Sequence, residues 1–514
     1  MGHQHPLLSR VGLLALAGAL LCYGAAGAGR SAQDAREPIG PRQFYPRSTS
    51  TLKAAIQAMV AGAVTPRAAR PAAIVVPHAG YVYSGQIAAD AYRQAAAHRY
   101  DTVVIVGTNH TDGVFRKVAI APGRVFRTPL GGAPIDEAFV AALQKEDSDC
   151  VIEAGPHRAE HSVEVQVPFV QQLFPAAKIV PLVVGRPDQA MCVRLGRALA
   201  ALSKDRSVLL VASSDLSHYP KAEDAGREDR ATLELVANLD VGGLYQRELG
   251  ESATRTPGLD THACGAGAIM AVMTAARALG ASHGTVVSYA NSGETSVGEP
   301  SRTVGYGAVV FTSGERGADI EALKAPARDA GALQPGDKKT LLAFARETIR
   351  RYLATETLPL PRGFSPRVQK NRGVFVTLNM HRELRGCIGH IPSDLPLPRL
   401  VGAMALAAAF GDPRFSRVTL DELRDIEIEI SILSPPARVG GPSDIVVGRD
   451  GVVIAADGRG AVFLPQVAPQ QGWTRDQMLD NLCVKAGLPA GRWRRPGMTF
   501  ETFQAEVFHE GEFK

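Results

Sequence analysis

The sequence lacks several features that would place it in a specialised class of protein. It has no internal repeat at solenoid periods, and beyond residue 30 no apolar run is long enough to span a bilayer. Lysine and arginine total 56 against 51 acidic residues, and the two signs are interspersed along the chain. Charge therefore gives no indication of nucleic-acid binding. Membrane contact is expected only if the apolar N-terminal segment is retained.

Cysteine is scarce and irregularly placed. The chain has six cysteines, with no CxxC pair and no regular spacing. Such a pattern excludes a disulfide framework and favours reduced thiols. They are Cys22, Cys150, Cys192, Cys264, Cys387 and Cys483.

Residues 1–29 resemble a secretory signal peptide. A small and apolar run follows a short basic start, and "AGA" at 26–28 offers a cleavage site. An uncleaved N-terminal anchor is the alternative, and a misassigned start is another, because 41–56 reads like the beginning of a domain. A genuine signal predicts a periplasmic or secreted protein, whereas without one a cytoplasmic location is expected.

The remaining 485 residues suggest two domains joined by a linker. From 40 to 313, short β-branched runs alternate with alanine-rich helical stretches, which predicts an α/β domain with a mostly parallel sheet sandwiched by helices. Residues 314–337 are polar, small and aperiodic, as expected of a linker. A second domain is predicted over 338–514, and it opens with an amphipathic helix.

Histidines follow three of the predicted strands of the first domain. His78 follows the run at 72–77, His110 follows the run at 101–107, and Asp215 and His218 follow the run at 207–214. Ligands of open α/β sheets bind beyond the carboxyl ends of the strands. One histidine at a strand end is usually an ordinary loop residue, but three at the same edge indicate a site. Two neutral imidazoles and one anionic ligand suit a divalent transition metal.

Two further segments supply candidate residues. The segment 156–174 reads as a helix start that includes His161, and on a helix Glu160 and Glu164 would share a face. The stretch 260–280 reads as a buried helix.

If Asp260 or Thr261 caps the helix predicted over 260–280, Cys264 lies in its first turn. There the helix dipole would lower the pKa of the thiol. The alternative is that Cys264 is a small core residue. A thiolate ligand would favour iron, copper or zinc over magnesium.

Five motifs of the first domain resemble the Memo family in order and spacing, over roughly 70–312. Memo proteins in turn resemble the class III extradiol dioxygenases, which are non-haem iron enzymes. The resemblance implies a metal site at His78, His110 and Cys264, with iron or copper expected and zinc also compatible. The motifs are "PHAGYVYSG", "GTNHTDG", "EHSVEVQVPFVQ", "SSDLSHY" and "HACGAGAI".

The same resemblance suggests catalytic residues. His218 falls where the dioxygenases carry an acid/base histidine, and Asp215 and His161 would line the same pocket. The expected activity is that of a metal-dependent oxidoreductase, in which the metal binds O₂ or an oxyanion while His218 or His161 moves a proton. Cysteine in place of the dioxygenase carboxylate argues against ordinary dioxygenase activity. Two alternatives remain: a pocket that binds a small molecule or peptide without turnover, and metal-assisted hydrolysis.

In the second domain, "LRGCIG", "DPRF" and "LPQVAPQQGW" resemble the AMMECR domain family, whose fold is α+β and whose activity is not established. Arg385, Cys387 and Arg414 form its candidate site. Cys387 is either a reactive thiolate beside a positive charge or a residue that fills a core pocket. Arg414 either binds an anion or forms a salt bridge.

The two resemblances together suggest a partner. Memo-like and AMMECR-like domains recur with a radical-SAM enzyme in the so-called AmmeMemoRadiSam system. This chain has no CxxxCxxC cluster, so a radical-SAM component would be a separate protein.

Overall fold

The computed structural model describes residues 35–40, 43–66, 70–250, 256–313, 332–391 and 395–513. The segment expected to be a signal peptide, 1–29, lies outside these residues, and so does most of the expected linker. No helix in the described ranges combines the length and the apolar composition needed to cross a membrane.

The first domain is built on a mixed sheet of eight strands, in the order β10-β11-β2-β9-β3-β8-β4-β7. Its four central strands, β2, β9, β3 and β8, run parallel, which confirms the predicted α/β class. Strands β1, β5 and β6 form a small separate sheet. The strands of this domain are β1 (Ala35–Arg36), β2 (Ala73–Val76), β3 (Thr102–Thr108), β4 (Val118–Ile120), β5 (Val125–Thr128), β6 (Gly131–Pro134), β7 (Cys150–Ile152), β8 (Lys178–Val184), β9 (Val208–Ser213), β10 (Ala281–Asn291) and β11 (Gly305–Ser313).

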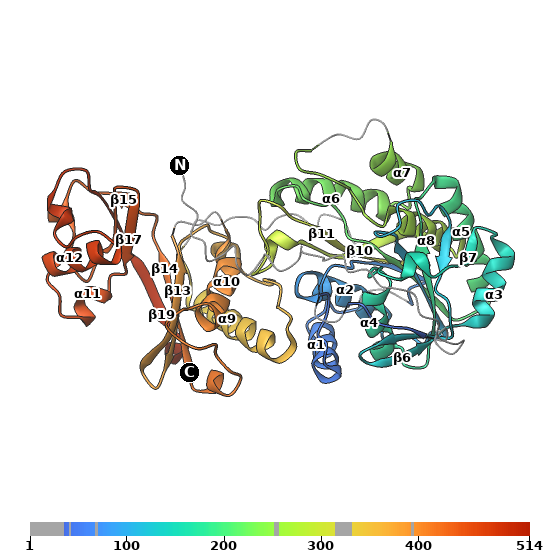
Figure 1. Cartoon of the computed structure of the whole chain (residues 1–514), viewed down its shortest axis with the longest axis horizontal. Helices are drawn as coiled ribbons and strands as arrows, with labels where there is room; N and C mark the ends of the chain where they lie inside the picture. Colours follow the sequence, from blue (N-terminus) through green and yellow to red (C-terminus); the bar gives the residue numbers. More distant parts are fainter. Residues whose placement is uncertain are drawn as a thin grey trace, which may run out of the picture.

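Helices cover both faces of this sheet (Figure 1). Helix α8 packs against α5 and the central strands, while α2 packs with α1 against strands of the other face. Strands covered on both faces must be apolar throughout, and β2 and β9 are fully buried along their lengths. The helices are α1 (Thr49–Ala61), α2 (Tyr81–Ala95), α3 (Glu137–Glu146), α4 (Val167–Leu173), α5 (Gln189–Ser203), α6 (Ala222–Ala237), α7 (Val241–Leu249) and α8 (Ala266–Ala278), with short 3₁₀ turns η1 (Gly155–His157), η2 (Glu164–Gln166) and η3 (Ser292–Glu294).

The second domain is α+β and contains two four-stranded antiparallel sheets, in the orders β13-β12-β14-β19 and β15-β18-β16-β17. Helices α9 and α10 cover one face of the first sheet, and α11 and α12 accompany the second (Figure 1, orange to red). Its elements are α9 (Pro335–Thr355), β12 (Val374–Met380), β13 (Glu383–His390), α10 (Leu397–Phe410), β14 (Ile426–Leu433), β15 (Ala437–Arg438), β16 (Gly451–Ala456), β17 (Arg459–Phe463), α11 (Val467–Gln470), α12 (Arg475–Lys485), β18 (Thr499–Phe503) and β19 (Ala505–His509).

Two helix boundaries differ from the sequence interpretation. Helix α9 begins at Pro335, three residues before the expected start of the second domain, because Gln334 and Asp337 form a capping box. The helix predicted over 260–280 begins only at Ala266, with Gly265 as its N-cap. Cys264 therefore precedes the helix and does not lie in its first turn.

Three arginines of the second domain reach into the first. Arg351 is 5% exposed and Arg399 is 6% exposed, and burial of a guanidinium requires partners for its donors. The contacts are Arg351 Nη2 to Gln86 Oε1 at 2.9 Å, Arg362 to both carboxylate oxygens of Asp90 at 3.0 and 2.5 Å, and Arg399 Nε to the carbonyl oxygen of Thr295 at 3.0 Å.

Candidate functional site

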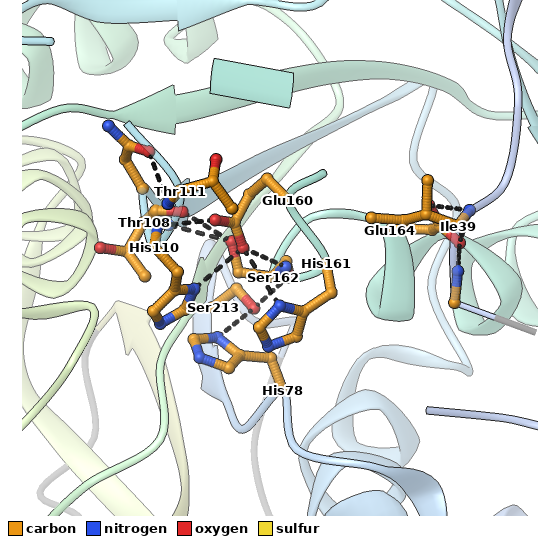
Figure 2. A network of polar contacts seen from close by, with 12 residues as sticks. Ile39, His78, Thr108, His110, Thr111, Glu160, His161, Ser162, Glu164 and Ser213 are labelled. Carbon is orange, nitrogen blue, oxygen red and sulfur yellow. Dashed lines mark hydrogen bonds and ion pairs between the residues drawn. The ribbon is translucent and has the colours of Figure 1, made fainter. Parts of the chain in front are cut away.

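The carboxyl ends of β2, β3 and β9 bring the predicted histidines together. His78, His110 and His161 each offer one ring nitrogen, and these three nitrogens all lie within 4.8 Å of one another. His78 follows β2 and His110 follows β3, as the sequence predicts, whereas His161 comes from the irregular segment before η2 (Figure 2). The sheet order places β9 between β2 and β3, so all three strand ends open at one edge.

The hydrogen bonds of His78 identify its free nitrogen. Its side chain is buried, and Nδ1 lies 3.2 Å from Ser213 Oγ. The single hydroxyl proton of Ser213 is donated to the carbonyl oxygen of Ser162 at 2.6 Å. Ser213 Oγ must therefore accept from His78, which places the proton on Nδ1 and leaves a lone pair on Nε2. Gln166 Nε2 donates to the same hydroxyl at 2.9 Å and fixes its orientation.

His110 and His161 share one buried carboxylate. His110 Nδ1 donates to Glu160 Oε1 at 3.0 Å, and His161 Nδ1 lies 3.5 Å from the same oxygen. Glu160 also accepts from the backbone N–H groups of His110 and Ser162. In the neutral form of His110 these contacts place the proton on Nδ1 and the lone pair on Nε2, which is the arrangement that carboxylates impose on metal-binding histidines. The sequence interpretation grouped Glu160 with Glu164 on one helix face and gave it no role beside the histidines, although "HRAEH" places a carboxylate between two histidines.

Burial and the contacts of Glu160 together set the ionisation of this group. Desolvation lowers the pKa of His78 well below its ordinary value and lowers that of His161 to about 3, so both rings are neutral at neutral pH. Burial also lowers the pKa of His110, but the hydrogen bond and charge of Glu160 outweigh it and leave that pKa raised. The pKa of Glu160 falls below its usual range, because its contacts with His110 outweigh the opposing effect of burial. Neutral imidazoles beside a carboxylate suit a divalent cation.

Cys264 lies beside this group rather than apart from it. Its Sγ is 3.1 Å from His78 Nε2, the nitrogen that carries the lone pair. Burial raises the pKa of the thiol well above its ordinary value. The S–H group therefore donates to His78 in the protein as described, and loss of this proton would supply a thiolate at the same position.

Asp215 and His218 also lie at this edge, with different contacts. Asp215 Oδ1 accepts the backbone N–H groups of His78 at 2.7 Å and Ala79 at 3.2 Å, so the carboxylate fixes the turn after β2. His218 Nε2 is buried and has no hydrogen-bond partner among the described residues. Burial lowers the pKa of His218, which keeps the imidazole neutral. The next residue, Tyr219, has φ of 74°, a conformation that bulky residues rarely adopt and that often accompanies functional loops.

The segment 156–174 does not form the single helix expected from its sequence. It contains two 3₁₀ turns and the short helix α4, and its two glutamates face different partners (Figure 2). Glu164 is fully buried and accepts from Arg36, from the N–H groups of Ile39 and Gly40, and from the hydroxyl of Tyr45. It therefore anchors the chain at its four partner residues, and within the described part of the chain no hydrogen bond joins it to His78, His110 or His161.

The candidate residues of the second domain separate into two groups. Arg385 is 7% exposed and is bound to Glu422 at 3.0 Å and to the carbonyl oxygen of Ser416 at 2.9 Å. Cys387 and Arg414 lie together, since Arg414 Nη2 donates to the carbonyl oxygen of Cys387 at 3.2 Å. Arg414 also forms a salt bridge with Asp412 at 2.6 Å.

Comparisons with known proteins agree with both domains. A family model described as "Memo-like protein" matches residues 36–310, and one described as "AMMECR1" matches residues 342–508. MEMO1 family proteins of Methanosarcina barkeri and Nitrosopumilus maritimus are 36% and 33% identical to this chain, over 54% of it and 99% of their own lengths. A crystal structure of an uncharacterized protein from Pyrococcus horikoshii is 34% identical over 35% of this chain and 93% of that protein, with a TM-score of 0.34.

Proposed function

Given that the chain belongs to the Memo-like family and carries an AMMECR1 domain fused behind it, we infer that it is a metal-dependent oxidoreductase whose site lies in the Memo-like domain. One observation carries this proposal: three imidazoles gather at the carboxyl edge of the sheet, with their ligand atoms within 4.8 Å of one another. Hydrogen bonds direct the lone pairs of His78 and His110 onto Nε2.

The donor set fits a transition metal better than magnesium or calcium. Imidazole nitrogen is a ligand for zinc, copper and iron, whereas magnesium and calcium prefer oxygen. His78 and His110 would be the two constant ligands. The third would be either His161, which completes the histidine group, or Cys264, whose sulfur lies 3.1 Å from His78 Nε2. A bound iron or copper ion would supply one-electron redox chemistry and open coordination positions for substrate.

The surrounding residues would then orient ligands and move protons. Glu160 holds His110, and Ser213 holds His78, each through Nδ1. His218 is suited to act as the general base, because it is neutral and its buried Nε2 has no partner among the described residues. Asp215 is a positioning residue, since its carboxylate binds the backbone of the turn that carries His78.

The test is metal analysis of the purified full chain after incubation with iron, copper or zinc and removal of the excess. We expect one equivalent of metal, lost in His78→Ala and in His110→Ala but retained in His98→Ala. His98 precedes β3, whereas His110 follows the opposite end of that strand. A protein that retains no metal would overturn the proposal.

Two further variants identify the third ligand. Loss of metal in Cys264→Ser but not in His161→Ala would assign the thiolate, and the opposite result would assign the imidazole. Oxygen consumption or electron transfer by the loaded protein supports an oxidoreductase. Turnover that proceeds equally without oxygen or any electron acceptor would instead indicate metal-assisted hydrolysis.

A further inference from the structure

One of the three arginines that join the domains binds a loop of the first domain rather than a helix. Arg399 lies in the first turn of α10. Its Nε donates to the carbonyl oxygen of Thr295 at 3.0 Å, and its Nη2 donates to that of Gly298. Both carbonyls belong to residues 292–304, the loop that connects β10 to β11. The other two arginines bind side chains of α2.

The burial of Arg399 is costly and is not balanced by an ion pair. Burial lowers its pKa to about 10, an effect that the charge of Glu294 opposes, so the guanidinium is charged at neutral pH. Within the described ranges no carboxylate forms an ion pair with it, and its Nη1 has no hydrogen-bond partner. An apolar side chain of similar volume often fills such a place at lower cost. What the arginine adds is its pair of hydrogen bonds to the loop.

Hydrogen bonds connect the bound part of the loop to its far end. Thr295 donates its N–H and its hydroxyl to the carbonyl oxygen of Ser292, at 3.1 and 2.8 Å. The N–H of Ser292 donates to the carbonyl oxygen of Val304 at 2.8 Å, and its Oγ accepts from the N–H of Val304 at 3.0 Å. Thr295 and Ser292 are buried, so water does not compete for these bonds. The position of Thr295 therefore constrains that of Val304.

Val304 is paired with the residue proposed as the general base. It forms an isolated antiparallel bridge with His218, and the N–H of Tyr219 donates to the carbonyl oxygen of Thr303 at 2.6 Å. On its other flank, His218 donates its N–H to the carbonyl oxygen of Thr261 at 3.0 Å. Tyr219 has φ of 74°, and such a conformation persists only where surrounding contacts enforce it. The loop supplies one side of those contacts.

We propose that Arg399 is a positioning residue through which the second domain holds His218 in the site of the first domain. The inference rests on the proposed function, in which His218 moves the proton. Coupling between distant groups is carried by contiguous contacts, and here every step from Arg399 to the turn that carries His218 is a backbone or side-chain hydrogen bond. Without the guanidinium the loop gains freedom, and the imidazole no longer keeps one position. The AMMECR1 domain thereby contributes to the geometry of the Memo-like site.

Hydrogen exchange read by mass spectrometry on the full chain measures this coupling at the turn. Peptides that cover 216–222 and 300–306 report the amides of Tyr219 and Thr303, which are bonded across the bridge and next to it. In Arg399→Ala we expect these peptides to exchange roughly tenfold faster than in the wild type, the factor that corresponds to about 1.4 kcal/mol. Peptides from the buried strand β2 should keep their wild-type rates, which shows that the first domain stays folded.

Arg351→Ala is the matched control. Arg351 is 5% exposed against 6% for Arg399, but its partner in the first domain is Gln86 of α2. Its removal should leave exchange at 216–222 unchanged. Arg399→Lys keeps a charged donor for the loop carbonyls and should restore part of the protection. Wild-type exchange in Arg399→Ala would overturn the proposal, and so would equal acceleration by Arg399→Ala and Arg351→Ala.

A second measurement reads the imidazole itself. Diethyl pyrocarbonate modifies unprotonated imidazole nitrogens, and Nε2 of His218 is buried. We expect Arg399→Ala to raise the rate of labelling at His218 severalfold, with His98 labelled at the same rate in both chains. Unchanged labelling of His218 would overturn its positioning by Arg399.

Zinc binding separates this inference from the proposed function. The expected ligands do not belong to the β10–β11 loop, so Arg399→Ala should bind zinc as the wild type does. A chain that binds no zinc but shows the exchange difference would overturn the proposed function alone. A chain that binds zinc and shows no exchange difference would overturn the coupling alone.

Discussion

Replacement of Glu160 by glutamine tests whether the buried carboxylate organises the histidine group. Oε1 of Glu160 accepts from His110 Nδ1 and from the N–H group of Ser162, and Oε2 accepts from the N–H group of His110. Glutamine offers one oxygen and one NH₂ group, so at least one N–H donor must face another donor in either orientation. The loss of a buried hydrogen bond predicts a decrease of about 1–3 kcal/mol in the free energy of unfolding.

The same substitution should weaken metal binding. Loss of a carboxylate partner of a metal-binding histidine typically lowers affinity by about 10- to 100-fold, which is roughly 1.4–2.7 kcal/mol. Calorimetric titration of the metal-free full chain with zinc, which has no redox chemistry, measures this affinity directly. The expected result for Glu160→Gln is a dissociation constant raised by that factor, with a stoichiometry that stays at one.

Glu164→Gln is the matched control. Glu164 is equally buried on the same segment and accepts from four donor groups where Glu160 accepts from three, but its partners are Arg36, Ile39, Gly40 and Tyr45. The Glu164→Gln variant should cost at least as much stability and leave zinc affinity unchanged. A zinc affinity in Glu160→Gln within twofold of the wild type would refute the assigned role, and equal weakening by both variants would assign the effect to general loss of structure.

Three further variants test the energetics of the fold. Desolvation raises the pKa of Glu294 to about 7, although its side chain keeps contact with solvent. The folded state therefore binds a proton that the unfolded state releases above about pH 4.5, and stability falls as pH rises through that window. Because solvent screens an exposed group, we expect Glu294→Gln to gain only about 1 kcal/mol at pH 8 and nothing near pH 4, by urea unfolding at the two pH values. Gly305→Ala would place its Cβ 2.0 Å from an oxygen of the fully buried Asp229, so we expect a loss of about 1–3 kcal/mol, and unchanged stability would contradict the packing described. Arg362→Ala leaves the carboxylate of Asp90 buried without its cation. We expect a loss of about 2–3 kcal/mol in thermal unfolding, which is smaller than the loss for a fully buried ion pair because Arg362 is partly exposed. Simultaneous Asp90→Asn should restore part of this loss.

The sequence was a good guide to elements that depend on local pattern. Continuous apolar runs identified β2, β3, β8 and β9, and the rule that ligands bind beyond the carboxyl ends of parallel strands placed His78 and His110 at one edge. Each of these inferences needs only the pattern of residues that are neighbours in sequence and the known handedness of the connections between parallel strands.

The segment 156–174 shows where local pattern was insufficient. Its charged residues have helical spacing, but their carboxylates satisfy distant donors, which outweighs the helical preference. Glu160 turns toward His110, and Glu164 turns toward the chain near Tyr45. His161 was predicted to line the pocket and to be able to move a proton, and that role stays a prediction. Its ring lies within the histidine group, because the irregular backbone before η2 brings it beside the other two.

The amino-acid sequence alone determined the class of each domain, the strand ends that carry histidines, and the residue types available for metal and thiol chemistry. Only the tertiary structure decided which of these residues meet. Hydrogen-bond partners such as Ser213 and Glu160 are far from His78 and His110 in the chain, and the nitrogen that remains free depends on them. Burial and hydrogen bonding set the charge of each group, and both are properties of the folded chain.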